Sequence, residues 1–531
     1  MIGRADVSLF TDDDNRKGKV MSITTREVFW GAAVCALLAA PAEATTWYAG
    51  TGNNAADSNT GTADRPVKTV AKALSLTTPG DTVVFAAGTY PCFRVKAPDG
   101  AQDLPIILRS DGKGKVIFTN DGSRDILVLG SYNTIDGIEF RMTSGHPKGS
   151  GIRIERKQHD IIRNCRFYAC EVGVDVVSSH YLSITNCEMA YSGTYGIHLN
   201  GSGQDVPGHW NPEDENRYVE VRNCYLHDAG WNIAGTEGYG FTANGAVEFL
   251  VIENCQIDNN SGDGILYEDW AVHSSARYNV IRGTGIAAIW IDNASMSIFD
   301  NNYLEANNVA VWFSGEESSN RYLSDFISIR NNIIVHNDWA LFDPSGTDKS
   351  VYGKTTLLIT SNTRDVYFDN NTVAFNRGNR VVGLENRPPQ NEYSNIWFRN
   401  NIFWRNSGAV GVDAGLDAKD LHFLSNLWDK PYAGDSQAKT GDPRFVNPEA
   451  HSPEGYRIQG NSAARGQGML LYENQVDFWN GARPHLSKIE KYDIGAHQFG
   501  SKGTARVGLD LATFPFAVPS FKLQFKAKPE L

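Results

Sequence analysis

The chain has 531 residues and a formal net charge of −12, from 49 Lys and Arg against 61 Asp and Glu. This acidic balance argues against nucleic acid or an anionic lipid surface as the main partner, although a local basic patch would still allow an anionic polymer to bind. The length allows several ordinary domains, but a repeat within the chain removes that inference, because a solenoid grows along one axis.

The N-terminal residues favour an export signal. From Met21 the chain has a positive flank, an apolar run over residues 28–40 and a small-residue site that ends at Ala44. This pattern is typical of a secretory signal peptide, and the run is too short to span a bilayer. We therefore predict that residues 1–44 are a dispensable extension plus signal peptide, with the start at Met21 and cleavage after Ala44. The protein would then be secreted or periplasmic, without membrane insertion; a buried helix or a short anchor is the alternative.

Residues 45–125 differ from the rest of the chain. Trp47–Ala49 has the character of a short strand, and residues 66–76 have helical spacing of apolar side chains after a proline, which is favoured at a helix start. The end of a solenoid leaves an open strand edge that must be covered. We expect this segment to be an N-terminal cap with the first coils.

Residues 126–436 carry a repeat that returns roughly every 22 to 24 residues as an asparagine-containing pair. Self-similarity at a fixed short period is typical of one supersecondary unit stacked on itself. The pattern therefore predicts a solenoid. The second residue of the pair is, in successive repeats, Cys165, Cys187, Cys224, Cys255, Asn279, Asn302, Asn332, Asn371 and Asn401.

This column of Cys and Asn predicts structure rather than chemistry. Residues at one position of successive turns lie about 4.8 Å apart, so Asn side chains can bond along the stack and Cys side chains can fill the same buried space. All cysteines except Cys35 remain after the signal peptide, and an even number in a secreted protein invites a disulfide interpretation. Because four of them share the column, we predict no disulfide framework; a Cys165–Cys170 pair stays open.

A second signal follows each pair: a small residue and then a strand of alternating character. Three wider gaps locate inserted loops at residues 201–217, 314–322 and 344–363. Insertions in repeat proteins often crowd the binding face. The predicted strands start at Ile152, Val174, Ile197, Phe241, Ile265, Ile289, Val311, Leu341, Val381 and Val410.

These features resemble the right-handed parallel β-helix superfamily of secreted carbohydrate-active proteins, which includes pectate lyases, polygalacturonases, alginate lyases and epimerases. The resemblance rests on the repeat, on WYAGTGNNAADSNTGTADRPVKTVAKAL near the N-terminus and on the late DIGAHQF, and spans roughly residues 46–500. It implies an all-β fold, a right-handed parallel β-helix of about 10–12 coils with an irregular C-terminal tail over residues 437–531. These motifs are specific for fold and weak for reaction, because the fold hosts several functions.

Outward positions of successive strands form columns on the surface, because side chains alternate along a strand. One column places Asn244, Glu268 and Asp292 on consecutive turns, and Asp269 ends the same strand as Glu268. Stacked like charges on an unliganded sheet are costly, so this column favours function over decoration.

Glu268 and Asp292 are the predicted catalytic pair. Their backbones should lie about 4.8 Å apart, and two carboxylates this close cannot both ionise easily, so one pKa should rise. An acid beside a charged carboxylate is what a glycosidase needs, and a separation near 5 Å suits a retaining mechanism. The pattern predicts glycoside hydrolysis without a cofactor and does not distinguish nucleophile from acid. Residues expected to bind substrate are Asp175, His198, Asn200, Asn244, Asp269, Trp290 and Trp312, the two tryptophans by stacking on sugar rings.

The same oxygens allow a second function. Asn244, Glu268, Asp269 and Asp292 could hold Ca²⁺. The resemblance implies a Ca²⁺-dependent polysaccharide lyase or epimerase, in which calcium neutralises a uronate carboxylate and a Lys or Arg takes the proton. No Lys occupies the central columns, which departs from that pattern. His273 and Arg277 are near in register but should turn off the face, whereas Arg217, Lys349 and Lys354 could reach it from inserted loops.

A third function is non-catalytic, with the columns serving as a glycan-binding groove or as part of a surface assembly. The sequence favours an enzyme, most simply a monomer, whose partner is a polysaccharide or oligosaccharide.

Overall fold

A computed structural model gives the fold of the unit Ala44–Leu531. The predicted signal peptide lies outside the described residues. The described ranges are 44–145, 147–201, 214–230, 237–268, 270–315, 324–337, 355–360, 362–385, 393–484, 492–504 and 507–517.

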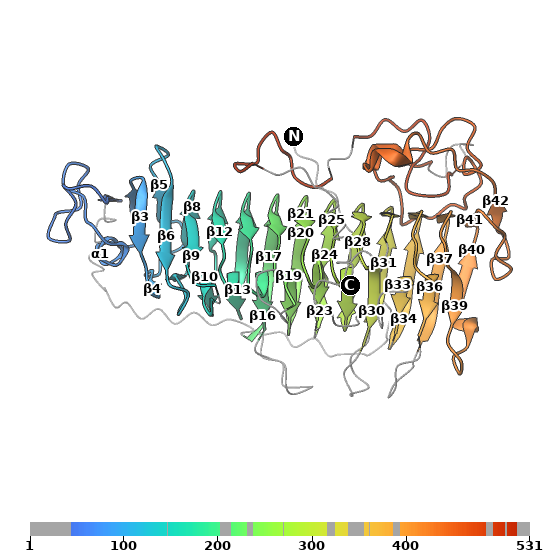
Figure 1. The fold of residues 1–531 in the computed structure, drawn as a ribbon, viewed down its shortest axis with the longest axis horizontal. Helices are drawn as coiled ribbons and strands as arrows, with labels where there is room; N and C mark the ends of the chain where they lie inside the picture. Colours follow the sequence, from blue (N-terminus) through green and yellow to red (C-terminus); the bar gives the residue numbers. More distant parts are fainter. Residues whose placement is uncertain are drawn as a thin grey trace, which may run out of the picture. The chain divides into compact units, whose positions relative to one another are not determined.

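Three parallel sheets run along the unit, and most coils of the chain add one strand to each of them (Figure 1); in the two coils at residues 271–277 and 294–300 the sheet A strand is split in two. The coil that begins at β10 (Ser150–Glu155) continues through β11 (Ile161–Arg163) and β12 (Arg166–Tyr168) and returns to β13 (Val172–Val177), which pairs with β10 in parallel. The predicted parallel stack is thus confirmed. The sheets are named A, B and C, and their strands are given in order along the stack.

Sheet A contains β1 (Thr46–Ala49), β2 (Thr82–Phe85), β5 (Ile106–Ser110), β8 (Asn133–Asp136), β11, β14 (His180–Thr185), β17 (Asn216–Arg222), β20 (Val247–Glu253), β23 (Ala271–Val272), β24 (Ser275–Arg277), β27 (Ala294–Ser295), β28 (Ile298–Asp300), β31 (Ser324–Arg330), β34 (Thr363–Asp369), β37 (Tyr393–Arg399) and β40 (Leu421–Leu424). Sheet B contains β3 (Gly88–Pro91), β6 (Val116–Asn120), β9 (Glu139–Met142), β12, β15 (Glu188–Ala190), β18 (Tyr225–His227), β21 (Gln256–Asp258), β25 (Val280–Arg282), β29 (Tyr303–Glu305), β32 (Ile333–Val335), β35 (Thr372–Ala374), β38 (Ile402–Trp404), β41 (Leu427–Trp428) and β42 (Lys439–Thr440). Sheet C contains β4 (Val95–Lys96), β7 (Leu127–Val128), β10, β13, β16 (Tyr195–Asn200), β19 (Tyr239–Asn244), β22 (Ile265–Tyr267), β26 (Ala287–Asp292), β30 (Val309–Ser314), β33 (Thr355–Ile359), β36 (Arg380–Leu384) and β39 (Ala409–Val412).

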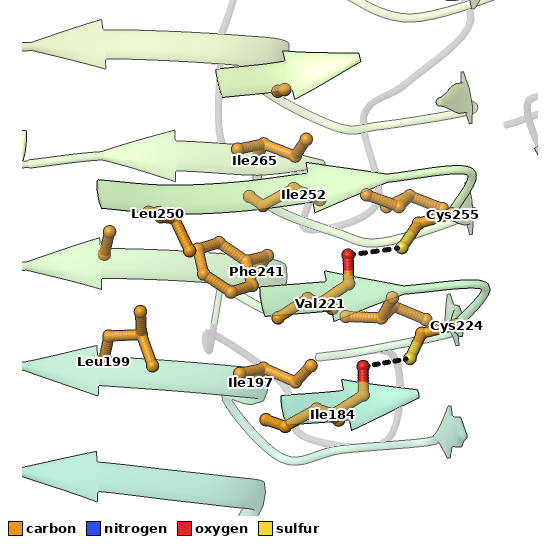
Figure 2. Close-up of a cluster of buried hydrophobic side chains, with 14 of the residues drawn as sticks. Ile184, Ile197, Leu199, Val221, Cys224, Phe241, Leu250, Ile252, Cys255 and Ile265 are labelled. Carbon is orange, nitrogen blue, oxygen red and sulfur yellow. Dashed lines mark hydrogen bonds between the residues drawn. The ribbon is translucent and has the colours of Figure 1, made fainter. Parts of the chain in front are cut away.

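The inside of the coils is the hydrophobic core. Inward Ile, Val, Leu and Phe side chains of the three sheets form one buried cluster from Ala49 to Trp428. Figure 2 shows a section of it, in which Ile197 and Phe241 of sheet C face Val221 and Ile252 of sheet A. Because parallel strands stack in register, each inward side chain packs on its equivalents in the coils above and below, which explains the repeat of aliphatic residues.

The Cys–Asn column lies at the turn from sheet A to sheet B and is structural, as predicted. The buried, free thiols of Cys224 and Cys255 donate to the carbonyls of Ile184 and Val221, at 3.6 and 3.7 Å (Figure 2). In later coils an amide replaces the thiol: Asn371 donates to Ile329 O at 2.9 Å and to the next Asn of the column at 3.0 Å. An amide has both donors and an acceptor, so it bonds the backbone and the next coil together.

The small residue before each sheet C strand is required by close approach between coils. A Cβ atom on Gly173 would lie 2.4 Å from the carbonyl oxygen of Gly196, and one on Gly196 would lie 2.5 Å from that of Gly240. Such contacts are far inside van der Waals range, so a larger side chain would force the coils apart. This geometry explains why the small residue marks the strand so reliably.

The N-terminal cap and the C-terminal tail close different parts of the unit. Helix α1 (Val70–Leu74) is shorter than the helical spacing over residues 66–76 predicted; it is capped by Thr69 and buries Val70 and Leu74 in the core at the N-terminal end. Three short 3₁₀ turns occur near the tail, at Ala418–Asp420, Pro448–Ala450 and Pro453–Tyr456. The tail packs on the outer face of sheet B, where Tyr303, Ile333, Val335 and Ile402 meet Phe445, Tyr456, Trp479 and Ile494.

One predicted strand position is wrong. The sequence placed a strand at Leu341 and a loop over residues 344–363, whereas β30 pairs with β33, which begins at Thr355. The inserted chain precedes this strand instead of following it. An inserted loop changes the number of residues in its coil by an amount that the repeat does not reveal. The repeat therefore could not locate the strand that follows the insertion. Among the described residues, no helix is long and apolar enough to cross a bilayer.

Candidate functional site

The long connections of the β-helix adjoin sheet C. Between β16 and β17 the chain runs from Gly201 to Glu215, and between β30 and β31 from Gly315 to Leu323. These two connections run from sheet C to sheet A. A third long connection, between β32 and β33, runs from sheet B to sheet C. By contrast, the turn from sheet A to sheet B stays short, as between β17 and β18. Because binding loops vary while the scaffold does not, sheet C is the face to examine.

The predicted column on sheet C is in register. Asn200 pairs with Asn244, and Asp292 pairs with Ser314. Glu268 directly follows β22, and its backbone N–H donates to Ala243 O at 2.7 Å, which continues the ladder. Asn244, Glu268 and Asp292 therefore occupy consecutive coils on the outer face. Asp269 lies outside the described residues.

Within this column Asn244 orients Glu268. The Asn244 Nδ2 atom donates to Glu268 Oε2 at 2.9 Å. The side chain of Asp292, one coil further on, is mostly buried, with 7% of the residue exposed. The structure thus bonds the amide to one carboxylate and places the second carboxylate on the next coil.

The two tryptophans do not form the predicted exposed platform. Trp290 and Trp312 stack on each other, with ring centroids 4.0 Å apart and planes within 4°. Both indole N–H groups are bonded, to Ser314 and Thr360 respectively. Trp312 is only 1% exposed because it packs in a small apolar cluster with Val309 and Leu358, so only Trp290 is accessible to a sugar.

Asp175 and His198 form a second group, on β13 and β16. The His198 Nδ1 atom lies 3.0 Å from Asp175 Oδ1, and Arg153 of β10 forms an ion pair with Asp175 Oδ2. Glu155 in turn lies 3.2 Å from Arg153. The sequence predicted that Asp175 and His198 bind substrate some turns away from the carboxylate pair, and the structure adds a direct contact between the two side chains.

Two tyrosines of this group were missed in the sequence. Tyr195 stacks on His198 at 4.5 Å and on Tyr239 at 5.4 Å, and all three lie on the outer face of sheet C. They belong to an outward column at the start of the strands, where Tyr195 pairs with Tyr239, just before the small residue. The sequence signal is an aromatic residue directly before the small residue in successive repeats, which Tyr195 and Tyr239 both provide.

Burial and nearby carboxylates raise the pKa values of Tyr195 and Tyr239. The pKa of Tyr195 is raised, first by burial and then by the negative charges of Glu268 and Glu171. The pKa of Tyr239 is raised as well, by burial and by Asp263 and Glu237. Both hydroxyl groups therefore keep their protons at ordinary pH.

The basic residues considered for a lyase lie on another face. Arg217 is on β17 of sheet A, paired with Glu215 at 2.6 Å and with Glu248 at 3.1 Å. His273 also contacts Glu248, and Arg277 on β24 is paired with Asp300. Their turning away from sheet C follows the prediction for His273 and Arg277. Lys349 and Lys354 fall outside the described ranges.

Of the four proposed calcium ligands, the structure describes Asn244, Glu268 and Asp292, while Asp269 lies outside the described residues. The Asn244 amide presents its nitrogen, not its oxygen, to Glu268, and a cation shared by the two would need the oxygen. In the part of the chain that the structure describes, no group of three His, Cys, Asp or Glu side chains is placed to hold a metal ion.

A cavity of about 670 Å³ lies in the tail, far along the chain from these residues, and is lined by Arg465, Asp493 and Phe499 among others. The carboxylate in this cavity stabilises the tail itself, because Asp493 accepts hydrogen bonds from the backbone N–H groups of Gly466 and Phe499 at 2.6 and 2.7 Å. Arg465 lies over the ring of Phe499. Because these groups bond within the tail, sheet C remains the better candidate.

Comparison with known proteins supports the fold. Residues 48–282 match the family described as "Pel9A-like, right handed beta helix region". Among solved structures the chain is similar to a GH136 lacto-N-biosidase from Eubacterium ramulus, with TM-score 0.50 and 14% identity over 71% of this chain and 68% of that one. It is also similar to the PL6 family alginate lyase AlyGC, with TM-score 0.54 and 15% identity over 74% of this chain and 56% of that one. No curated protein matches the sequence. The predicted right-handed parallel β-helix is confirmed.

Proposed function

We propose that this protein, a member of the right-handed parallel β-helix superfamily, is a carbohydrate-active enzyme that acts on a polysaccharide or oligosaccharide at the outer face of sheet C. The fold itself hosts many functions, so the proposal rests on the site. Two of the structures that share the fold are named for action on glycans, a lacto-N-biosidase and an alginate lyase. A face built from successive parallel strands, with long connections beside them in the chain, suits a chain-like substrate.

One observation carries the reaction assignment: Glu268 and Asp292 stand on consecutive coils, and Asn244 holds the Glu268 carboxylate at 2.9 Å. Adjacent parallel strands lie about 4.8 Å apart, which is close to the separation of the two carboxyl groups in retaining glycosidases. One carboxyl group protonates the leaving oxygen, and the other attacks the anomeric carbon from the opposite side. Water then releases the sugar, and the first group acts as base.

This reaction is tested by Glu268→Gln and Asp292→Asn, each of which keeps the shape of the side chain and removes its acid chemistry. Release of reducing ends from a panel of neutral and acidic glycans should fall by at least about 10²-fold in each variant. Glu220→Gln is the matched control, because Glu220 is an exposed carboxylate of sheet A that pairs with Arg222. Wild-type activity in either sheet C variant would sink the assignment.

Location and assembly follow as part of the same proposal. An enzyme for external polysaccharides is useful only outside the cytoplasm, in agreement with the export signal expected before Ala44. Fractionation of cells that express the full chain should place the protein in the periplasm or medium, shortened at its N-terminus. Light scattering should give the mass of a monomer.

A further inference from the structure

Four asparagines of the stack bind the C-terminal tail, and each is the first residue of a repeated pair. The Nδ2 atom of Asn370 donates to the carbonyl of Asp493 at 3.1 Å, and that of Asn400 donates to the carbonyl of Met469 at 2.7 Å. Amide groups do not titrate, so these bonds hold the tail equally well at every ordinary pH. The four are Asn301, Asn331, Asn370 and Asn400.

His497, in the DIGAHQF segment, joins two parts of the tail. Its Nδ1 atom accepts a hydrogen bond from the backbone N–H of Ile458 at 3.0 Å. Because an N–H group can only donate, Nδ1 must carry a lone pair, and protonation of His497 would break this bond. Its Nε2 atom lies 3.4 Å from Nη1 of Arg457, which is positively charged. A charged His497 would therefore lose one contact and be repelled at another.

His336, directly after β32, lies on the sheet B side of the same interface. Its ring stacks on Phe375 at 5.3 Å and lies 4.9 Å from the ring of His451 in the tail. The Nε2 atom of His336 is buried and has no hydrogen-bond partner among the described residues. Protonation would place a charge on this unpaired nitrogen, which is costly away from water. The tail thus packs best against a neutral His336.

The carboxylates near the two histidines are already paired with other groups. Glu305 lies 2.6 Å from His451 Nδ1 and 3.2 Å from Arg282 Nε, and Glu454 accepts from Arg457 at 2.6 Å. These carboxylates therefore offer little compensation for a new charge on either histidine. The other charged groups that face the histidines are Glu449 and Arg377 at His336, and Asp477 and Arg483 at His497.

The pKa values of both histidines agree with this geometry. The pKa of His497 is lowered from 6.5 to about 4, chiefly by burial, and the positive charges of Arg457 and Arg483 act in the same direction. Burial and then His451 lower the pKa of His336. A lowered histidine pKa contributes stability that is fully present above pH 6.5 and is lost as the pH falls through the folded value, about 4 for His497.

We propose that the tail is an acid-released strap, in which protonation of His336 and His497 opens the tail and uncovers the outer face of sheet B. That face includes Tyr303, Ile333 and Ile402, which are fully buried beneath the tail. Uncovered, they form an apolar patch of the kind that soluble proteins keep covered. The asparagine bonds hold the strap closed at neutral pH, and the histidines make its closure depend on pH.

This regulation is separate from the chemistry proposed for sheet C. His336 follows a strand of sheet B and His497 lies in the tail, whereas Glu268 and Asp292 belong to sheet C. Opening of the tail can be measured without any glycan. Failure of this proposal would therefore leave the hydrolase assignment untouched, and failure of that assignment would leave the strap untouched.

The test is native-state hydrogen exchange of the full chain, read by mass spectrometry at pH 7.5 and at pH 5. Protection factors correct for the pH dependence of the chemical exchange rate. With a pKa of 6.5 in the open tail and about 4 in the closed tail, titration of His497 alone should lower the protection of tail peptides roughly 25-fold. Peptides from β34 and β37 of sheet A should lose far less protection, and an apolar dye should bind at pH 5 only.

Two variants remove the titration without removing the packing. His497→Asn keeps an oxygen acceptor for the Ile458 N–H and cannot be protonated, so the fall that this histidine causes should disappear. His336→Phe keeps a stacked ring without a titratable nitrogen, and the double variant should show nearly constant tail protection. His422→Asn is the matched control and should respond as the wild type does, because His422 stacks on Trp397 of sheet A at 4.5 Å. Thermal melting at pH 7.5 checks that every variant is folded.

Three results would overturn the proposal. Tail protection that is the same at pH 7.5 and pH 5 in the wild type would show that acid does not open the strap. An equal loss of protection in the tail and in sheet A would show that the tail does not open by itself. A wild-type pH response in the double variant would show that other groups control the tail.

Discussion

Sheets A and C have the same parallel backbone arrangement, but the polar side chains on their outer faces make different interactions. On sheet A charged side chains pair from coil to coil: Arg163 lies 2.9 Å from Asp136, and Arg399 lies 2.6 Å from Asp369. On sheet C, Arg153 and His198 also pair with Asp175, but further along the stack an amide, Asn244, bonds the Glu268 carboxylate, and Asp292 lies on the next coil. The difference teaches that Arg–carboxylate pairs between coils are part of the scaffold, whereas a carboxylate oriented by an amide, with a second carboxylate on the next coil, marks a candidate site.

Aromatic residues repeat the contrast. Sheet A carries a continuous stack at one corner in which each ring covers the next, at spacings of 4.6 to 5.2 Å. All its members have a positive φ, a costly conformation for bulky residues, so contact between rings offsets backbone strain. The members are Tyr132, His159, Tyr181, Tyr218, Phe249 and His273. On sheet C the Tyr195 ring instead orients a histidine.

The largest expected effect separates the two faces by activity. Glu268→Gln should lower turnover of the preferred glycan by at least about 10²-fold and leave the melting temperature near that of the wild type, because its chemistry and not its packing is lost. Turnover kinetics and thermal melting on the same sample check both statements. If Glu268→Gln unfolded the protein while keeping the specific activity of the folded fraction, sheet C would be scaffold like sheet A.

The next largest expected effect is on stability and depends on pH, because it comes from a buried acid next to sheet A. Asp160, just before β11, is fully buried, accepts from the backbone N–H of Asn133 at 2.7 Å, and has its pKa raised from 3.8 to about 8 by burial. The folded chain thus holds this proton more tightly than the unfolded chain. The resulting stability is fully present below pH 3.8 and is lost as the pH rises through about 8.

Asp160→Asn keeps the acceptor for Asn133 and cannot ionise. It should melt at a higher temperature than the wild type at pH 9 and show a smaller fall in melting temperature between pH 5 and pH 9. Asp103→Asn, an exposed change in the same part of the chain, is the control. Equal pH dependence in wild type and Asp160→Asn would contradict the prediction.

Breaking a pair on sheet A should affect stability alone. Asp300 is buried and accepts from Arg277 at 2.8 and 2.9 Å and from Arg330 at 3.3 Å. Asp300→Asn leaves two guanidinium groups without their carboxylate and should lower the free energy of unfolding by about 2 kcal/mol. Denaturant unfolding measures this, and the activity of the folded enzyme should be unchanged. A loss of activity without a loss of stability would break the comparison between the faces.

The smallest effect concerns the ring stack. Tyr218 is 42% exposed, has φ +55°, and stacks on Tyr181 at 4.8 Å and Phe249 at 4.9 Å. Tyr218→Ala should cost about 1–2 kcal/mol, because two ring pairs are lost. Tyr218→Gly should be more stable than Tyr218→Ala by about 1 kcal/mol, because glycine adopts this φ without strain. The reverse order in denaturant unfolding would show that the backbone conformation carries no strain there.

Periodicity made much of this structure predictable. It gave the Asn column, whose members Asn332, Asn371 and Asn401 bond to one another along the stack, and it gave the alignment of Asn244, Glu268 and Asp292. Both follow from a constant number of residues per coil, because the sheet then converts sequence spacing into register.

What the sequence did not predict depends on contacts that no period encodes. Trp312 was expected to be exposed, but Val309 and Leu358 pack around it, and Leu358 enters only through an inserted connection of unknown length. Tyr195 lies before the small residue, where the strand makes its close approach to the next coil, outside the columns that were considered. The direct contact between Asp175 and His198 needs the rotamers of both side chains.

The central claim is that sheet C is the face that binds and transforms a glycan. The most direct test is a crystal structure of the inactive Glu268→Gln/Asp292→Asn variant with an oligosaccharide released from its preferred polymer. The account predicts sugar rings on the outer face of sheet C, between β13 and β30, in contact with β16 and with the residue at position 268. Sugar rings bound on sheet A, or in the cavity of the tail, with sheet C empty would contradict it.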